Sequence, residues 1–250
     1  MRIARSFVLS LAIATVAVNA HAIGLTSNNF DVDPQWHAVN NRTAPQNFGY
    51  TNTSFAGGSP GEIGGTVTRD STLAFYADNL GPILSLEDPL FMSGLIKEIP
   101  AGSSSHIQLG WFRASTASHP PTSYLGLELS NSGIYIGFAD NNGPLLDILT
   151  SVPAGGLTSF SLSYDPNAGA NGRITFVGNG SSTTAYDLTA TERSDGATFD
   201  HFGLFNVTVD GNPAQVFVDN LIYTAPEPSV LALLGLAGMM RLWRRSNGRS

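Results

Sequence analysis

The sequence has no cysteine and few basic residues. The first absence excludes disulfide bonds, thiolate metal sites and a cysteine nucleophile. Between residues 23 and 225, six Lys and Arg stand against 18 Asp and Glu, which gives a net charge of about −12. Such a surface repels the phosphates of nucleic acids, so we expect no nucleic-acid partner. It is compatible with calcium, or simply with solubility outside the cell.

Long segments with the apolar period of a helix are also missing between the two ends of the chain. Alternation is frequent instead: Phe160, Leu162 and Tyr164 alternate with serines, which is typical of a half-buried strand. Further strands are predicted, with turn residues between them, over residues 107–112, 124–129, 133–138, 173–177, 201–209 and 215–223. Many short strands predict an all-β fold, a two-sheet antiparallel jelly-roll sandwich, as one domain over residues 23–223.

The N-terminus carries the pattern of an export signal. Arg2 and Arg5 precede an apolar run of 12 residues over 7–18, and Ala20-His21-Ala22 then supplies small residues at a cleavage point. This order predicts a signal peptide over 1–22, removed by signal peptidase after Ala22. An N-terminal membrane helix is the alternative, and the short run disfavours it.

The C-terminus combines a short motif, an apolar run and a basic tail. Pro226-Glu227-Pro228 is followed by 12 apolar or small residues over 229–240, and then by Arg241, Arg244 and Arg245. A helix needs about 20 residues to cross a bilayer, so the run is marginal as a permanent anchor. Flanking arginines stay cytoplasmic, which places the preceding chain on the outer face of the inner membrane. We expect a proline-rich linker over 224–228, then a helical apolar segment and its basic tail over 229–250. An ordinary tail anchor or a buried helix is the alternative.

Together, these C-terminal features resemble the PEP-CTERM sorting signal of exported proteins in Gram-negative bacteria. The resemblance covers the last 25 residues of the chain. It implies recognition by an exosortase-type membrane protease and a precursor held transiently in the inner membrane by its C-terminal segment. It also implies a mature form that is extracellular or on the cell surface. Proteins with this signal tend to occur where exopolysaccharide is made, which implies extracellular polysaccharide as a partner.

The remaining chain resembles bacterial concanavalin A-like, or LamG-like, surface domains. The segments that carry this resemblance are 31–36, 40–42, 48–50, 56–58 and 61–65, with a closing strand over 216–223. The resemblance implies a jelly roll whose concave sheet often binds glycans and whose rim often holds calcium.

Two aromatic residues are the candidates for glycan binding. Trp36 lies in a polar segment, and Tyr50 accompanies it; aromatic faces stack on sugar rings while polar neighbours bind the hydroxyls. Packing of Trp36 under a loop is the alternative. Trp111 stands between Gly110 and Phe112 in an apolar strand, so we expect it in the core.

Calcium is the one cofactor for which the sequence offers candidate ligands. Asp140, Asn142 and Asp219 supply hard oxygens at predicted turns and on the last strand. The alternative is that Asp and Asn are there for turn geometry.

Signatures of catalysis are missing from the sequence. No predicted strand carries paired carboxylates, Glu128 stands alone between two leucines, and the histidines lack metal-ligand spacing. No nucleophile elbow, phosphate loop or dinucleotide fingerprint occurs. We therefore expect a non-catalytic, adhesive or glycan-associated component of the extracellular matrix. A polysaccharide-active enzyme of the same fold and a purely structural matrix protein are the alternatives.

Overall fold

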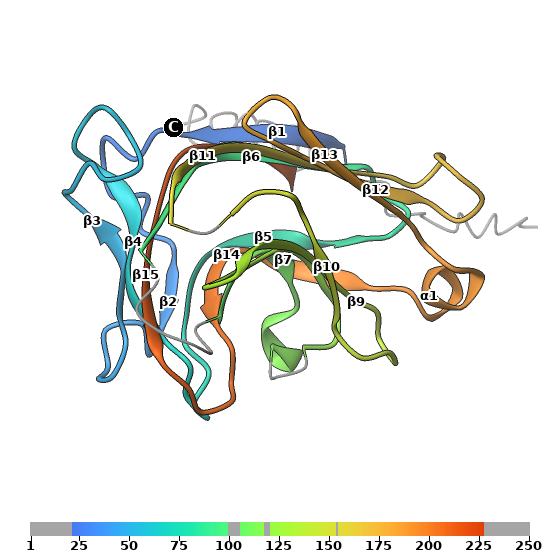
Figure 1. The fold of residues 1–250 in the computed structure, drawn as a ribbon. Coiled ribbons are helices and arrows are strands. Elements are labelled where there is room, and N and C mark those ends of the chain that lie inside the picture. The colour runs from blue at the N-terminus through green and yellow to red at the C-terminus, as the bar shows by residue number, and fades with distance from the viewer. Residues whose placement is uncertain (1–21, 100–105, 118–120, 154, 228–250) are drawn as a thin grey trace, which may run out of the picture.

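A computed structural model describes residues 22–99, 106–117, 121–153 and 155–227, and it shows two antiparallel sheets packed face to face (Figure 1). The eight-stranded sheet has the order β13 (Ser182–Asp187), β12 (Arg173–Gly178), β11 (Leu157–Asp165), β6 (Leu90–Ile99), β15 (Pro213–Pro226), β4 (Glu62–Thr68), β3 (Asn47–Thr51). Its eighth strand, β1 (Ile23–Asn28), pairs with β15. The seven-stranded sheet has the order β10 (Leu146–Leu149), β9 (Gly133–Ala139), β8 (Tyr124–Ser130), β7 (His106–Phe112), β14 (Thr198–Asn206), β5 (Phe75–Ser85), β2 (His37–Val39). The predicted all-β jelly-roll sandwich is confirmed.

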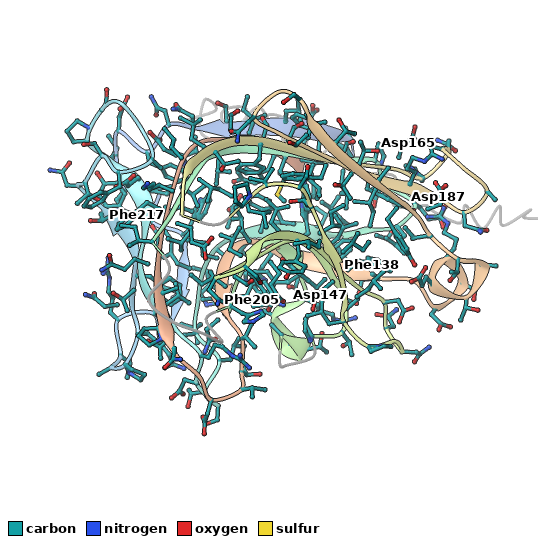
Figure 2. The ribbon with its side chains drawn as sticks, viewed as in Figure 1. Phe138, Asp147, Asp165, Asp187, Phe205 and Phe217 are labelled. Carbon is teal, nitrogen blue, oxygen red and sulfur yellow. The ribbon has the colours of Figure 1, made fainter. Side chains whose placement is uncertain are left out.

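The main core lies between the two sheets. It is built by alternation, because every second side chain of a strand points to the same face. In β11, Phe160, Leu162 and Tyr164 are buried, as predicted. Trp111 is fully buried in the same core, and its Nε1 donates to the carbonyl of Thr224 at 3.0 Å. Figure 2 shows side chains filling the space between the sheets.

All six further strands predicted from residue 107 onward are present, whereas the first third of the chain holds strands that we did not predict. Glu62 illustrates the difference, because its glycine-rich surroundings favour a turn, yet it begins β4 and is fully buried. Its carboxylate accepts hydrogen bonds from the amides of Phe55 (2.8 Å) and Ala56 (2.7 Å) and from the Thr53 hydroxyl (2.6 Å). These bonds satisfy the carboxylate inside the fold and hold the preceding loop against the strand.

The sandwich extends further toward the C-terminus than the predicted boundary at residue 223. Three residues of the predicted linker, Thr224, Ala225 and Pro226, continue β15 and pair with β1. Thr224 is buried, and its hydroxyl accepts from the Phe91 amide at 2.8 Å. Pro226 is tolerated because it is the last strand residue, where a missing amide hydrogen costs little. The extended stalk is therefore corrected to a strand over its first three residues.

Helical structure is sparse in the described residues. It comprises α1 (Ala190–Asp195), which begins with a capping box between Thr189 and Glu192, and the 3-10 helix η1 (Ala114–Thr116). Among the residues that the structure describes, no helix is long and apolar enough to cross a membrane. The predicted signal peptide up to His21 and the sorting segment from Pro228 onward lie outside the described residues, and so do Ala20, Arg241, Arg244 and Arg245.

Candidate functional site

The seven-stranded sheet has a second face, turned away from the eight-stranded sheet, which we call the outer face. On β7, Ile107, Leu109 and Trp111 point into the main core, so His106, Gln108 and Phe112 point to the outer face. The same alternation applies along β8, β9 and β10. Figure 2 shows two of the outer-face side chains, Asp147 and Phe205, on the side of this sheet that faces away from the other sheet.

Five residues from four neighbouring strands form a polar cluster on the outer face: His106, Gln108, Glu128, Tyr135 and Asp147. Cross-strand register brings them together, because Gln108 is opposite Glu128 and Glu128 is opposite Tyr135. Asp147 is opposite Gly137, on the same face of the sheet, and the charges of Glu128 and His106 act on its carboxyl group. The polar cluster is thus a product of pairing between strands that are distant in sequence.

Glu128 is the centre of the polar cluster. It is 2% exposed, and its carboxylate binds Nδ1 of His106 in a short contact and accepts from Gln108 Nε2 at 3.5 Å. A buried carboxylate needs such partners, because an unpaired one loses its hydration without compensation. His106 remains one-third exposed at its side chain and so faces solvent from above the carboxylate.

Asp147 lies at the rim of the same cluster on the edge strand β10. Although the residue as a whole is exposed, partial burial of its carboxyl group and the nearby charge of Glu128 raise its pKa to about 6, against a smaller opposing effect of His106. Tyr135 is half-buried, and its hydroxyl lies 2.9 Å from that of Ser132. The rim therefore presents a carboxyl group, an imidazole, hydroxyls and part of an aromatic ring to solvent.

An aromatic cluster fills the middle of the outer face. Phe75, Phe112, Tyr124 and Phe205 pack together, with the two phenylalanine rings of Phe112 and Phe205 4.4 Å apart. All four are buried, and Ala114 of η1 packs against them. The aromatic cluster is consequently a second small core and has no open ring face for a sugar.

A histidine pair ties the edge strand β2 to the outer face. Nδ1 of His201 bonds to a carboxylate oxygen of Asp200 at 2.7 Å, and its Nε2 lies 3.0 Å from Nδ1 of His37. A carboxylate accepts, so His201 donates from Nδ1 and, when neutral, accepts at Nε2 from His37. His37 is exposed, whereas His201 is packed against Phe75 and Phe112. The pair closes this end of the face by linking side chains of β2 and β14.

The two aromatic residues that were predicted to bind glycans lie away from the outer face. Trp36 is 9% exposed in the main core, where Phe30, Tyr76 and Tyr223 surround its ring at centroid distances of 5.6, 5.7 and 6.0 Å. The prediction that Trp36 is exposed for glycan binding is therefore wrong, and the alternative, that its ring is packed inside the protein, is correct. Tyr50 is half-buried on β3 of the other sheet and packs against the main core. Neither ring contributes to the outer face.

The three candidate calcium ligands do not come together. Asp140 follows β9, and its carboxylate accepts from the amides of Asn142 (2.9 Å) and Gly143, which is the turn geometry given as the alternative. Asp219 lies in the other sheet, at the irregularity of β15, and accepts from the Asn220 amide at 2.7 Å. Burial raises the pKa of Asp219. Within the described ranges, no three His, Asp or Glu side chains gather as a metal site would require.

The polar cluster was missed because spacing along the chain was the criterion. Glu128 is isolated on its own strand, and its partners come from β7, β9 and β10. A usable signal was present nonetheless: His106 and Gln108 alternate with Ile107 and Leu109 in a strand with apolar residues on its other face. A polar residue at every second position of such a strand indicates a polar patch on one face of a sheet.

Comparison with known proteins establishes the fold. The sequence matches no protein-family model and no curated protein. Its structure is similar to that of an endo-β-1,4-glucuronan lyase from the fungus Trichoderma reesei, with a TM-score of 0.53 and 12% identity, over 81% of this chain and 95% of that one. It also resembles the carbohydrate recognition domain of Emp47p (TM-score 0.46, 12% identity, 82% of this chain and 95% of that one). A variant of the family 7 alginate lyase A1-II′ in complex with a substrate gives a TM-score of 0.45 at 13% identity, over 67% and 80% of the two chains. The first likeness shows that this chain shares the concanavalin A-like jelly-roll sandwich.

Proposed function

We propose that this protein is an exported, non-catalytic, glycan-associated component of the cell surface or extracellular matrix. Its polar cluster on the outer face of the seven-stranded sheet is the observation that carries the proposal. A carboxyl group, an imidazole and hydroxyls lie on one side of a rigid sheet beside the ring of Tyr135. Sugars are bound by this combination, because fixed polar groups bind hydroxyls while a ring contacts the C–H groups.

The charge of the face selects the class of glycan. None of the seven strands contains a Lys or Arg, whereas Glu128, Asp147 and Asp200 lie on the outer face. Asp78 of β5 points to the other sheet, where it accepts from the Tyr223 hydroxyl at 2.6 Å. A polyuronate, such as the glucuronan named for the fungal lyase, carries a carboxylate on every sugar and is repelled by such a face. The face therefore favours a neutral glycan or one that contains amino sugars.

Binding is favoured over catalysis by the state of Glu128. A glycosidase needs two carboxyl groups that both reach the scissile bond. Glu128 is almost fully buried and already engaged by His106 and Gln108, so it holds the site together and does not face a substrate. A polysaccharide-active enzyme is the second candidate, because Asp147, whose pKa is raised to about 6, lies on the same face as a second carboxyl group, that of Glu128. Release of reducing or unsaturated sugar ends from a bound glycan would favour that candidate.

Export and sorting are supported by the two ends of the sequence. An apolar run behind Arg2 and Arg5 supports removal of a signal peptide by signal peptidase, and the Pro226–Pro228 motif with its apolar run and arginines supports an exosortase-type protease. We propose a precursor held in the inner membrane and a mature form outside the cell, with extracellular polysaccharide as its partner.

A glycan array on the fragment 22–227, which contains every described strand, tests the binding role. We expect saturable binding to neutral or amino-sugar glycans, at least tenfold weaker in Asp147→Ala. Asp210→Ala, which removes an exposed carboxyl group from the β14–β15 loop, is the matched control and should bind normally. Because the ionised carboxylate of Asp147 is the better acceptor, binding should weaken as the pH falls through about 6. An array that stays blank with and without calcium contradicts the proposal and favours a structural matrix role.

A further inference from the structure

The two ends of the folded domain meet at one place. Ile23 is opposite Pro226 in the pairing of β1 with β15, and the Glu227 amide donates to the Ala22 carbonyl at 2.7 Å. The side chain of Glu227 also lies close against Gly24. We call this place, formed by residues 22–25 and 224–227, the end corner. The chain therefore enters and leaves the sandwich side by side, as the register of β1 dictates (Figure 1).

Both apolar runs of the sequence are attached to the end corner through short connections. The first run ends at Val18, four residues before Ala22, and the second begins at Ser229, two residues after Glu227. An extended chain spans at most about 3.6 Å per residue. The connection to the first run is therefore at most about 15 Å long, and the connection to the second at most about 7 Å. A membrane or protein that binds these two runs must therefore lie next to the end corner.

The surface beside the end corner is apolar. A hollow of about 470 Å³ lies next to β1 and is lined by uncharged residues, Ile23, Gly24, Leu25, Pro89, Leu90, Phe91 and Thr224. Leu25, on β1 beside the hollow, is 63% exposed and adds to this apolar surface. Glu227 is the charged residue at the tip of the corner.

We propose that the end corner is the surface by which the precursor rests on a lipid bilayer. Leu25 and the hollow beside it contact the bilayer interface, where the exposed apolar side chains lose their contact with water. A lipid surface is the partner that fits, because both apolar runs connect to the end corner and the uncharged lining of the hollow limits repulsion between the acidic domain and anionic lipid. The proposal rests on the membrane-held precursor of the proposed function. It places the bond after Ala22 and the first two residues of the motif, Pro226 and Glu227, beside each other at the membrane surface, within reach of membrane-bound proteases.

The absence of cysteine makes a direct test possible, since a single introduced cysteine is labelled uniquely. The full chain carrying Leu25→Cys is labelled with an environment-sensitive fluorophore and reconstituted into vesicles of phosphatidylethanolamine and phosphatidylglycerol. Lipids with a spin label at the headgroup serve as quenchers. Gln215→Cys is the matched control: it is exposed, lies on the strand that pairs with β1, and is nine residues from Thr224, the partner of Leu25, or about 30 Å along the strand. Ser27→Cys, another exposed position on β1, serves if the first variant misfolds.

We expect a blue-shifted emission and strong quenching at position 25, or at 27, and neither effect at 215. Equal effects at both ends of the sandwich, or a chain that floats with the vesicles while position 25 stays unquenched, overturn the inference and leave the membrane-held precursor intact. A chain that fails to float with the vesicles contradicts the membrane-held precursor itself, and the inference with it.

Discussion

Glu98 is the residue whose placement departs furthest from ordinary solution chemistry. It points into the sandwich from β6, is 2% exposed, and neither carboxyl oxygen has a hydrogen-bond partner among the described residues. Burial raises its pKa to about 8, so the residue is neutral in the folded protein at pH 7. Its neutrality explains how an acid occupies a core position without a counter-ion.

The pH dependence of stability follows from this placement. The folded state keeps the proton of Glu98 up to about pH 8, whereas an unfolded chain releases it near the ordinary value of 4.5. The unfolded state therefore binds fewer protons between these values, and the free energy of unfolding falls as the pH rises through that window. The contribution of Glu98 to the free energy of unfolding is complete below about pH 4.5, and roughly a few kcal/mol of it is lost by pH 8.

Glu98→Gln should remove this dependence. An amide of similar shape stays neutral at every pH, so we expect urea unfolding midpoints of the variant to exceed those of the parent at pH 8 and to approach them at pH 5. Asp210→Asn, at an exposed loop position, should leave the parent's pH dependence unchanged. Parallel pH profiles for the parent and Glu98→Gln would show that the carboxyl group is ionised in the folded state.

Residue-level prediction from the sequence succeeded where the neighbours in the chain decide the environment. Trp111 lies in an apolar strand, and its burial was predicted. Trp36 lies in a polar segment, but Phe30, Tyr76 and Tyr223 cover it from other elements. Glu128 acquires His106 and Gln108 in the same way, through pairing with another strand. Local sequence does not contain the cross-strand neighbours that determine these environments.

At the scale of elements, Tyr124 depends on one glycine of its own strand β8 and one of the adjacent strand β9. Its fully buried ring lies across Gly126 and Gly137, and its hydroxyl donates to the Leu127 carbonyl at 2.7 Å. A Cβ at Gly137 would lie 2.6 Å from Cε1 of the ring. The glycines thus allow a large side chain to lie flat on the sheet, which supports the aromatic cluster.

Gly137→Ala should destabilise the sandwich. The ring of Tyr124 has little room to move, so we expect a loss of about 1–3 kcal/mol in the free energy of unfolding, measured by urea denaturation. Gly58→Ala is the control, because nothing lies within 4 Å of the added Cβ, and it should change stability by less than about 0.5 kcal/mol. A neutral result at Gly137 would mean that the ring does not occupy this position.

The strands themselves were predictable to different degrees along the chain. From residue 107 onward, regular alternation and turn residues mark every predicted strand. Before residue 100, six strands escaped prediction, because their pattern is interrupted by glycines such as Gly64 and Gly65 and by the buried acids Glu62 and Glu98. Glu62 is tolerated because of its hydrogen-bond partners, Glu98 because its pKa is raised, and the glycines because of close strand packing. A periodicity criterion includes none of these effects.

At the scale of the whole molecule, the fold brings together the attachment points of the two predicted signals, which stand at opposite ends of the sequence. Because β1 pairs with the end of β15, the predicted cleavage point after Ala22 lies beside Pro226 and Glu227, the first two residues of the motif. Pro226 belongs to the last strand, so a protease that binds the whole motif must displace this strand end from Ile23. The fold thereby links access to the motif with the pairing of β1.

Replacing Pro226, Glu227 and Pro228 by alanines tests the sorting role in the native host. Position 226 remains able to continue β15 as alanine, so the sandwich should fold and its thermal midpoint should stay within a few degrees of the parent. Without the motif, we expect an uncleaved precursor that fractionates with the inner membrane, detected by immunoblot of membrane and medium. Pro213→Ala, the proline at the opposite end of the same strand, is the matched control and should be processed normally. Normal release of the triple variant would refute sorting by this motif, because the folded domain, its exposed surface and its apolar segment are otherwise unchanged.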